Sequence, residues 1–173
     1  MYETSEDLAD LQRGLDESYA SAGEHYRSLI TPGRRSSAVD VADALKGAFM
    51  INLATVTVRC EPVVAPVDGL FYRGRLWFSL ARGTVRAAHL QVRQQVSATY
   101  VEGDPGACLM VHGAAREISE SPFSEGFDRY AREVYGPAIE FAQVQQRERT
   151  GPDFTGYIEP RRIYAQDFPV SAG

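Results

Sequence analysis

Cysteine, histidine and long apolar runs are scarce in this sequence of 173 residues. Its two cysteines, Cys60 and Cys108, are too few for a disulfide scaffold and lack CxxC spacing, so we expect reduced thiols. The three histidines, His25, His89 and His112, show no metal-ligand spacing, and no metal site is predicted. No stretch approaches the roughly 20 apolar residues that a membrane span needs. The first residues are acidic, unlike a secretory signal, and we expect a cytoplasmic protein with no membrane segment.

Negative charge outweighs positive charge in the whole chain, but not in every part of it. The formal net charge is -5 and the pI is about 5.2, which argues against nucleic-acid binding. Residues 69–101, however, contain no Asp or Glu, and they hold Arg73, Arg75, Arg82, Arg86 and Arg93. A locally positive site in an acidic protein suits a small anionic ligand. The alternative is an ordinary solvated face that happens to be rich in arginine.

A strand, a tight turn and a helix start follow one another inside this acid-free segment. Residues 75–80 are apolar and aromatic and predict a strand, and residues 85–93 predict a short helix after the turn at Gly83. Thr84 is placed to cap that helix with its hydroxyl, and Arg86 adds a permanent charge to the first turn. Because the first backbone N–H groups of a helix lack partners within it, this junction is a candidate phosphate seat.

Helices are expected before and after the strand-rich middle of the chain. Apolar residues recur at three- or four-residue spacing over residues 5–30 and predict one amphipathic helix, and a shorter helix is predicted over residues 37–46. We expect residues 1–36 to form an N-terminal helical arm that packs on the rest of the protein or on a second subunit. Helical spacing of aromatic residues also predicts a helical insertion over about residues 120–150.

Strands make up most of the remainder. They are predicted over residues 48–58, 63–71, 75–80, 96–101, 107–118 and 157–165. Pro66 cannot donate to a ladder, so its strand is expected to be an edge or irregular there, and Gly113 is expected at a bulge or bend. Three strands with short links, then two more after a small helix, predict a mainly antiparallel sheet that closes into a barrel.

The order and spacing of several short segments resemble one known family. The segments are Ala54-Thr55-Val56, a turn at Pro62, Val64-Ala65-Pro66-Val67-Asp68, Leu76-Trp77-Phe78-Ser79, Thr84-Val85-Arg86-Ala87-Ala88-His89-Leu90 and Val96-Ser97-Ala98. Together they resemble the pyridoxamine 5'-phosphate oxidase-like family of flavin-binding split β-barrels, and most of all its short actinobacterial flavin and deazaflavin oxidoreductases. The resemblance covers about residues 48–118, with residues 157–165 as the expected last strand.

This resemblance implies an antiparallel Greek-key split barrel with flanking helices, formed by residues 37–173, that works as a homodimer with the cofactor at the subunit interface. It also implies roles for particular positions. Thr84 and Arg86 would hold the cofactor phosphate. The strand before them would line the phosphate and ribityl chain, and the strand before that would run along the isoalloxazine edge. The candidate cofactor-binding residues are therefore Val64, Ala65, Pro66, Val67, Asp68, Phe78, Ser79, Leu80, Thr84, Val85, Arg86 and His89.

Three of these positions depart from the family pattern. A basic residue of the true pyridoxamine phosphate oxidases falls near Ala65, an arginine commonly stands at Val85, and relatives often have Asn or Gln at His89. Each missing charged hydrogen bond weakens phosphate binding by about 1 kcal/mol or more, so the vitamin B6 enzyme itself is not expected.

Two functions remain open from the sequence. One is an oxidoreductase that uses FMN or the deazaflavin coenzyme (factor 420) and transfers hydride to a small unsaturated or quinone-like substrate. The other is a non-catalytic protein that binds or stores flavin, deazaflavin or haem, the last because His112 lies on a long predicted strand. A flavin supplies the hydride chemistry itself, so no catalytic residue is named.

Overall fold

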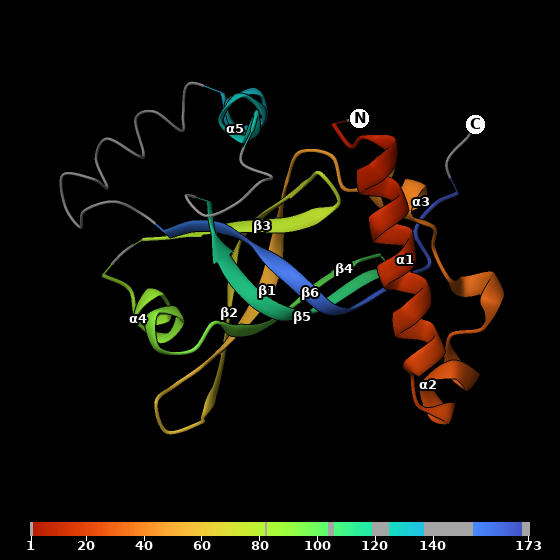
Figure 1. Cartoon of the computed structure of the whole chain (residues 1–173), viewed down its shortest axis with the longest axis horizontal. Coiled ribbons are helices and arrows are strands. Elements are labelled where there is room, and N and C mark those ends of the chain that lie inside the picture. The colour runs from red at the N-terminus through yellow and green to blue at the C-terminus, as the bar shows by residue number, and fades with distance from the viewer. Residues whose placement is uncertain (1, 82, 104–105, 119–124, 137–153, 171–173) are drawn as a thin grey trace.

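Six strands with alternating buried and exposed residues curl into a closed barrel in this computed structural model, which describes residues 2–81, 83–103, 106–118, 125–136 and 154–170. The strands are β1 (Ala48–Val56), β2 (Pro62–Tyr72), β3 (Arg75–Leu80), β4 (Gln95–Glu102), β5 (Ala107–Glu117) and β6 (Phe154–Gln166). All neighbours are antiparallel, in the order β1-β2-β3-β6-β5-β4 (Figure 1). The predicted fold class, a mainly β antiparallel barrel with flanking helices, is confirmed.

Five α-helices lie around the barrel in the part of the chain that the structure describes. They are α1 (Ser5–Ser21), α2 (Glu24–Leu29), α3 (Ala38–Ala44), α4 (Val85–Val92) and α5 (Phe127–Tyr135). The single helix predicted over residues 5–30 is wrong, because Ala22 and Gly23 both adopt extended backbone and separate α1 from α2. Glycine is a poor helix former, and the apolar spacing on either side concealed this break.

Helix α1 is part of the barrel's own core. Leu11, Leu15 and Tyr19 are buried in one cluster with the inward face of the barrel, and α1 lies across β6 (Figure 1). Backbone groups of β6 also bond to the helix: the Ile163 N–H donates to Ser18 Oγ at 2.9 Å, and the Tyr19 hydroxyl donates to the Ala165 carbonyl. Of the two surfaces expected for the arm, the rest of the protein or a second subunit, α1 packs on the barrel of its own chain.

A second apolar cluster lies outside the barrel, beneath α5. Trp77 is fully buried there, its ring centroid 4.2 Å from that of Phe127, and its Nε1 donates to the Tyr72 carbonyl at 2.9 Å. Helix α5 falls within the predicted insertion, and the remainder of that insertion, residues 119–124 and 137–150, lies outside the described residues. This cluster covers the outer face of β2, β3 and β6.

The bulge expected at Gly113 is present where β5 meets β6. His112 pairs with Arg162 but Gly113 pairs with Pro160, so Arg161 is an extra residue on β6. A Cβ atom on Gly113 would lie 1.9 Å from the carbonyl oxygen of Glu159, which only glycine avoids. A bulge re-aims side chains, and both Arg161 and Arg162 are exposed here although they are consecutive in a strand.

The barrel is split along one edge of β2. Strand β3 pairs with β2 only over residues 69–72, so among the described strands residues 62–68 have β1 as a neighbour on one side and no strand on the other. Pro66 lies in this open stretch, as expected for a residue without an N–H group. The open edge leaves backbone groups of β2 available to a ligand.

Truncation of Leu15 to alanine tests the place of α1 in the core. Because the side chain is completely buried, Leu15→Ala should lower the free energy of unfolding by about 2–5 kcal/mol. Glu17→Ala, on the exposed face of the same helix, should change it by no more than about 0.5 kcal/mol. Chemical denaturation followed by circular dichroism measures both, and equal effects would contradict a core role for α1.

Gly113→Ala tests the bulge. The added methyl group has no room against the Glu159 carbonyl, and we expect a loss of at least about 3 kcal/mol in stability. Gly33→Ala is the matched control, because a Cβ atom there meets nothing within 4 Å. Thermal unfolding compares the two, and a Gly113→Ala protein as stable as the control would show that the strands do not approach this closely.

Candidate functional site

The predicted strand, turn and helix start are present at the β3–α4 junction. Thr84 has extended backbone and caps α4, with its hydroxyl accepting from the Ala87 N–H at 3.3 Å and donating to the Ala81 carbonyl at 2.8 Å. The Ala88 N–H donates to the Thr84 carbonyl. The N–H groups of Val85 and Arg86 have no partner within the helix and remain for an outside acceptor. These two amides, rather than the engaged Thr84 hydroxyl, are the donors at this helix start.

Of the described arginines in the acid-free segment, Arg86 is the one whose guanidinium has no hydrogen-bond partner among the described residues. The buried Nε atoms of Arg86 and of Arg75 both lack an acceptor there, but Arg75 is held through its Nη1. The neighbouring arginines are engaged structurally, and Arg82 lies outside the described residues. Arg73 Nε bonds to Asp7 at 3.2 Å, Arg75 to the Gly74 carbonyl at 3.2 Å and Arg93 to the Thr57 carbonyl at 2.6 Å. Three of the four described arginines of this segment therefore stabilise the fold, and Arg86 is the described one that remains for an anion.

The other predicted site residues divide into exposed and buried groups. Val64, Pro66, Asp68, Ser79 and Val85 are exposed. Ala65 is half-buried, and Val67, Phe78, Leu80 and His89 are buried, so a ligand beside these four would meet mainly their backbone. Ser79 Oγ lies 3.0 Å from Thr155 Oγ1 on β6.

His89 links α4 to the β1–β2 hairpin. Its Nδ1 lies 2.9 Å from Thr55 Oγ1, and both side chains are buried. Thr55 pairs with Val63 at the open edge of β2. This bond holds the helix that carries Arg86 against the hairpin, so His89 acts as a positioning residue in the fold.

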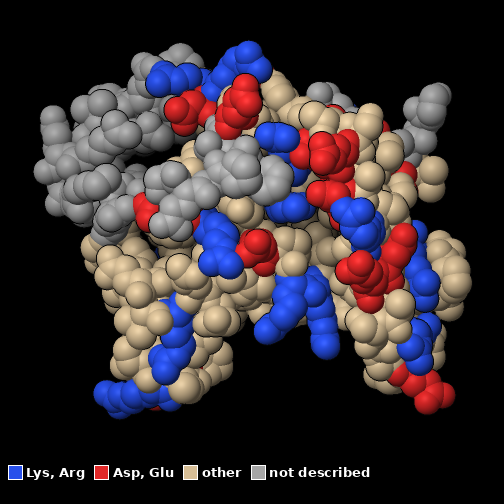
Figure 2. All heavy atoms as spheres, in the orientation of Figure 1, with Lys and Arg blue, Asp and Glu red and all other residues tan. Residues whose placement is uncertain are grey.

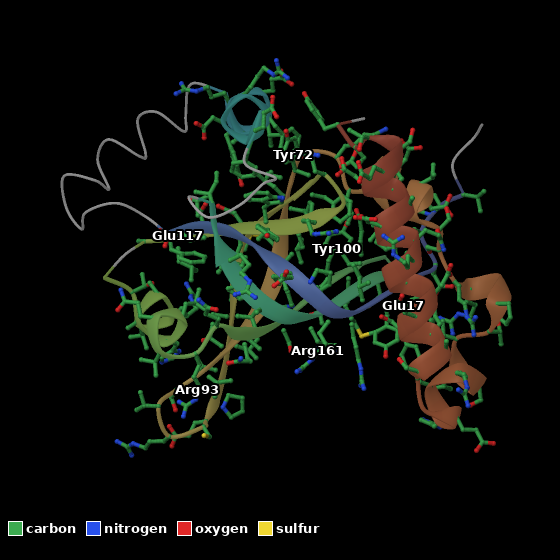
Figure 3. The ribbon with its side chains drawn as sticks, viewed as in Figure 1. Glu17, Tyr72, Arg93, Tyr100, Glu117 and Arg161 are labelled. Carbon is green, nitrogen blue, oxygen red and sulfur yellow. The ribbon has the colours of Figure 1, made fainter. Side chains whose placement is uncertain are left out.

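A cavity of about 730 Å³ lies elsewhere, on the outer face of the barrel, and neither Thr84 nor Arg86 lines it. Its walls come from β1, β2, β4, β5 and β6: Ala54, Thr55, Val56, Pro62, Gln95, Val96, Ser97, His112, Gly113, Arg161 and Arg162. Figure 2 shows basic side chains in the hollow beneath the barrel, and Figure 3 labels Arg161 there. A smaller cavity of about 150 Å³ lies between α4 and the β5–β6 pair.

Sequence reasoning missed the larger cavity. The available signals were the adjacent Arg161 and Arg162 after Pro160, and the bulge glycine, but nothing in the sequence pairs them with His112. The strand register makes that connection, because His112 lies opposite Ser97 on one side and opposite Arg162 on the other.

The surroundings of His112 in this cavity favour the neutral imidazole over the charged form. Its Nδ1 lies 2.8 Å from Ser97 Oγ. Burial lowers the pKa of His112 below its usual 6.5, and the charges of Arg162 and Arg161 lower it further. With Nδ1 engaged, Nε2 is the ring nitrogen that is left for a ligand.

In the part of the chain that the structure describes, no three His, Cys, Asp or Glu side chains gather where they could hold a metal ion. No helix in it is long and apolar enough to span a membrane.

No family model and no curated protein matches the sequence, but solved structures match the fold. The conserved hypothetical protein Rv2991 from Mycobacterium tuberculosis is 20% identical, with 83% of this chain and 96% of that one covered and a TM-score of 0.62. An FAD-binding protein from Mesorhizobium loti is 16% identical, with 77% and 94% covered and a TM-score of 0.57. A heme-binding protein from Mycobacterium smegmatis is 17% identical, with 75% and 53% covered and a TM-score of 0.57.

These neighbours share one architecture with this chain. The chain has the fold of the pyridoxamine 5'-phosphate oxidase-like split β-barrels, and the resemblance seen in the sequence is confirmed.

The pKa of His112 is a direct check on the cavity's charge. An NMR titration should place it below 6.5, Arg162→Gln should raise it, and Arg13→Gln, which removes a charge from an exposed pair on α1, should leave it unchanged. Because the folded state binds fewer protons than the unfolded state below pH 6.5, stability should fall as the pH drops through 6.5 and stop falling below the folded pKa. A normal His112 pKa, unchanged by Arg162→Gln, would contradict this account.

Proposed function

We propose that this chain is a flavin-dependent oxidoreductase that binds FMN between the β3–α4 junction and the open edge of β2. The observation that carries the proposal is the arrangement at the junction. A capped helix presents two amides that have no partner within the helix, and beside them Arg86 has a buried Nε without an acceptor among the described residues. A helix N-terminus with an adjacent guanidinium suits a phosphate monoester.

The residues at this site fit the two parts of FMN differently. The Val85 and Arg86 amides and the Arg86 guanidinium would hold the phosphate, while the Thr84 hydroxyl keeps the helix start in shape. The open edge of β2 over residues 62–68 would contact the isoalloxazine edge, since no strand of the described chain occupies that side. The cationic partners are few, and this supports moderate rather than tight affinity.

FMN, bound here, supplies hydride transfer to or from N5 of its ring. The chain's own part is to bind the phosphate, to orient the ring along β2 and to shape the space over one face. A small, flat, unsaturated or quinone-like substrate would fit over the exposed face of the ring and accept the hydride. No residue at the junction is needed as a catalytic acid or base, and we name none.

The deazaflavin coenzyme is the second choice of cofactor. Its longer acidic tail would need more cations than FMN. Arg73 is instead paired with Asp7, and Arg93 bonds to a backbone carbonyl. This use of the arginines favours FMN.

A homodimer is part of the proposal. Met50, Val64 and Val101 are 55%, 62% and 63% exposed on the neighbouring strands β1, β2 and β4. The strand register turns all three to the outer face of the barrel. Exposed aliphatic side chains gathered on one sheet face are typical of an interface. A second subunit on this face would cover the cofactor beside β2.

Cofactor titration tests the proposal on the purified full-length protein. FMN should bind with a shift in absorbance and quenched fluorescence, and Arg86→Gln should weaken binding about tenfold or more because it removes a charged hydrogen bond. Arg13→Gln, an equal change of charge on α1, should bind FMN like the native protein. No FMN binding, or equal binding by both variants, would contradict the proposed seat.

The same titration separates the alternatives. A Soret band with hemin in the absence of FMN binding would favour the haem alternative, for which His112 is the candidate ligand. FMN binding with no turnover of a quinone under NADPH or reduced deazaflavin would favour a binding or storage role over an oxidoreductase.

A further inference from the structure

We propose that the aromatic cluster beneath α5 is an electron-transfer chain that carries an oxidising equivalent from the buried Trp77 to Tyr2 at the surface. Once the Trp77 indole has lost one electron, Tyr72 reduces it. The stacked rings of Tyr72 and Tyr130 then pass the oxidising equivalent to Tyr2. The chain of rings does not depend on a flavin, whereas the flavin as its oxidant rests on the proposed function.

The rings of these four residues lie against one another and lead from the barrel wall to the N-terminus. The centroids of Trp77 and Tyr72 are 6.1 Å apart, and Trp77 Nε1 donates to the Tyr72 carbonyl at 2.9 Å. The Tyr72 and Tyr130 rings stack at 5.1 Å, and Figure 3 labels Tyr72 between α5 and the start of α1. Tyr2 lies 6.0 Å from Tyr72 and 4.6 Å from Tyr130. These are separations of aromatic rings in contact, across which an electron tunnels readily because tunnelling weakens steeply with distance.

Tyr2 is the ring of this chain that reaches water. It is 40% exposed, whereas Trp77 is completely buried and Tyr72 and Tyr130 are 5% and 4% exposed. A reductant in solution therefore meets the radical at Tyr2. The loss of the phenolic proton to water also holds the radical at this end, which gives the chain a direction.

Two further rings lie against Trp77 without offering an exit to water. Phe127 stacks on it at 4.2 Å, but a phenyl ring is much harder to oxidise than an indole or a phenol. Tyr157 lies at 5.1 Å and is itself buried, so a radical shared with it does not meet solvent there. The route to the surface therefore runs through Tyr72.

Electrons and protons balance along the chain. The radical cation of Trp77 takes one electron from Tyr72, and the vacancy moves over Tyr130 to Tyr2. In the sum, Trp77 regains its electron, and Tyr2 loses one electron and its phenolic proton, which passes to water. Burial and the charge of Glu3 raise the pKa of Tyr130 to about 12. The Glu3 carboxylate is thus close enough to hold the Tyr130 proton while that ring is oxidised.

The buried end of the chain lies close to the proposed cofactor seat. Trp77 and Ser79 are two residues apart on β3 and share a face, so their Cα atoms are about 7 Å apart. Ser79 is a candidate cofactor-binding residue. Trp77 is therefore placed to give one electron to a light-excited flavin, which is a one-electron oxidant. The chain would then move the oxidising equivalent away from the cofactor to the surface.

Flash photolysis of the full-length protein tests the chain from its buried end, because Trp77 is the sole tryptophan of the sequence. Light at the red edge of protein absorption excites indole and not phenol, and it ejects one electron that dissolved oxygen takes up. We expect the tryptophan radical signal to decay while a tyrosyl radical signal grows, at a rate independent of protein concentration. A nitroso spin trap followed by peptide mass spectrometry should locate the tyrosyl radical at Tyr2.

Three variants, each without one phenolic hydroxyl, define the route. Tyr72→Phe should lose the spin-trap adduct at Tyr2. Tyr2→Phe, at the exposed end, should form a tyrosyl radical at the native rate, and that radical should persist longer because it stays on buried rings. Tyr100→Phe makes the same change beside the core of the barrel and should keep the adduct at Tyr2. Circular dichroism verifies that all three variants are folded.

Three results would overturn the inference. They are decay of the tryptophan radical without growth of a tyrosyl radical, a rate that rises with protein concentration, and an adduct at Tyr2 that survives Tyr72→Phe or disappears in Tyr100→Phe. Because light oxidises Trp77 directly, a protein that fails to bind FMN gives the same results. Failure of this inference is therefore distinct from failure of the proposed cofactor seat.

Discussion

The pairing of β6 with its two neighbours is the constraint on which the rest of this structure depends. β6 lies between β3 and β5, so it closes the barrel although it is the last strand in the chain. It also provides the backbone groups that bond to Ser18 and Tyr19 of α1, and its extra residue at the bulge directs the arginines of the cavity. A change that displaced β6 would therefore disturb barrel closure, the helical arm and the cavity together.

The use of arginine connects the fold with function. Arg73, in the turn between β2 and β3, bonds to Asp7 of α1, and Arg93, at the end of α4, bonds to the Thr57 carbonyl of the β1–β2 hairpin. These two arginines stabilise the fold. Arg86 has no such partner in the described chain. An unpaired guanidinium beside amide donors binds oxyanions, so Arg86 is where the cofactor phosphate is proposed to bind.

Much of the fold could be predicted, and particular residues show where prediction ended. Thr84 as a helix cap and Gly113 as a bulge followed from local rules, because a cap and a bulge depend on neighbours close in sequence. The break of the first helix at Gly23 was missed because apolar spacing continued across it. Of the candidate site residues, Phe78 and Leu80 are buried at 2% and 3% exposure, a consequence of strand alternation inside a closed barrel.

The sequence by itself determined the order of strands and helices, the strand-to-helix junction at Thr84 and the family resemblance, since these rest on local propensity and spacing. Only the tertiary structure decided which arginines are paired and which stay free. The partner of a paired arginine, such as Asp7 for Arg73, comes from a distant part of the chain. It also decided that Ser97, His112 and Arg162 share one cavity. That grouping arises from strand register, which is set by packing around the whole barrel rather than by any single segment.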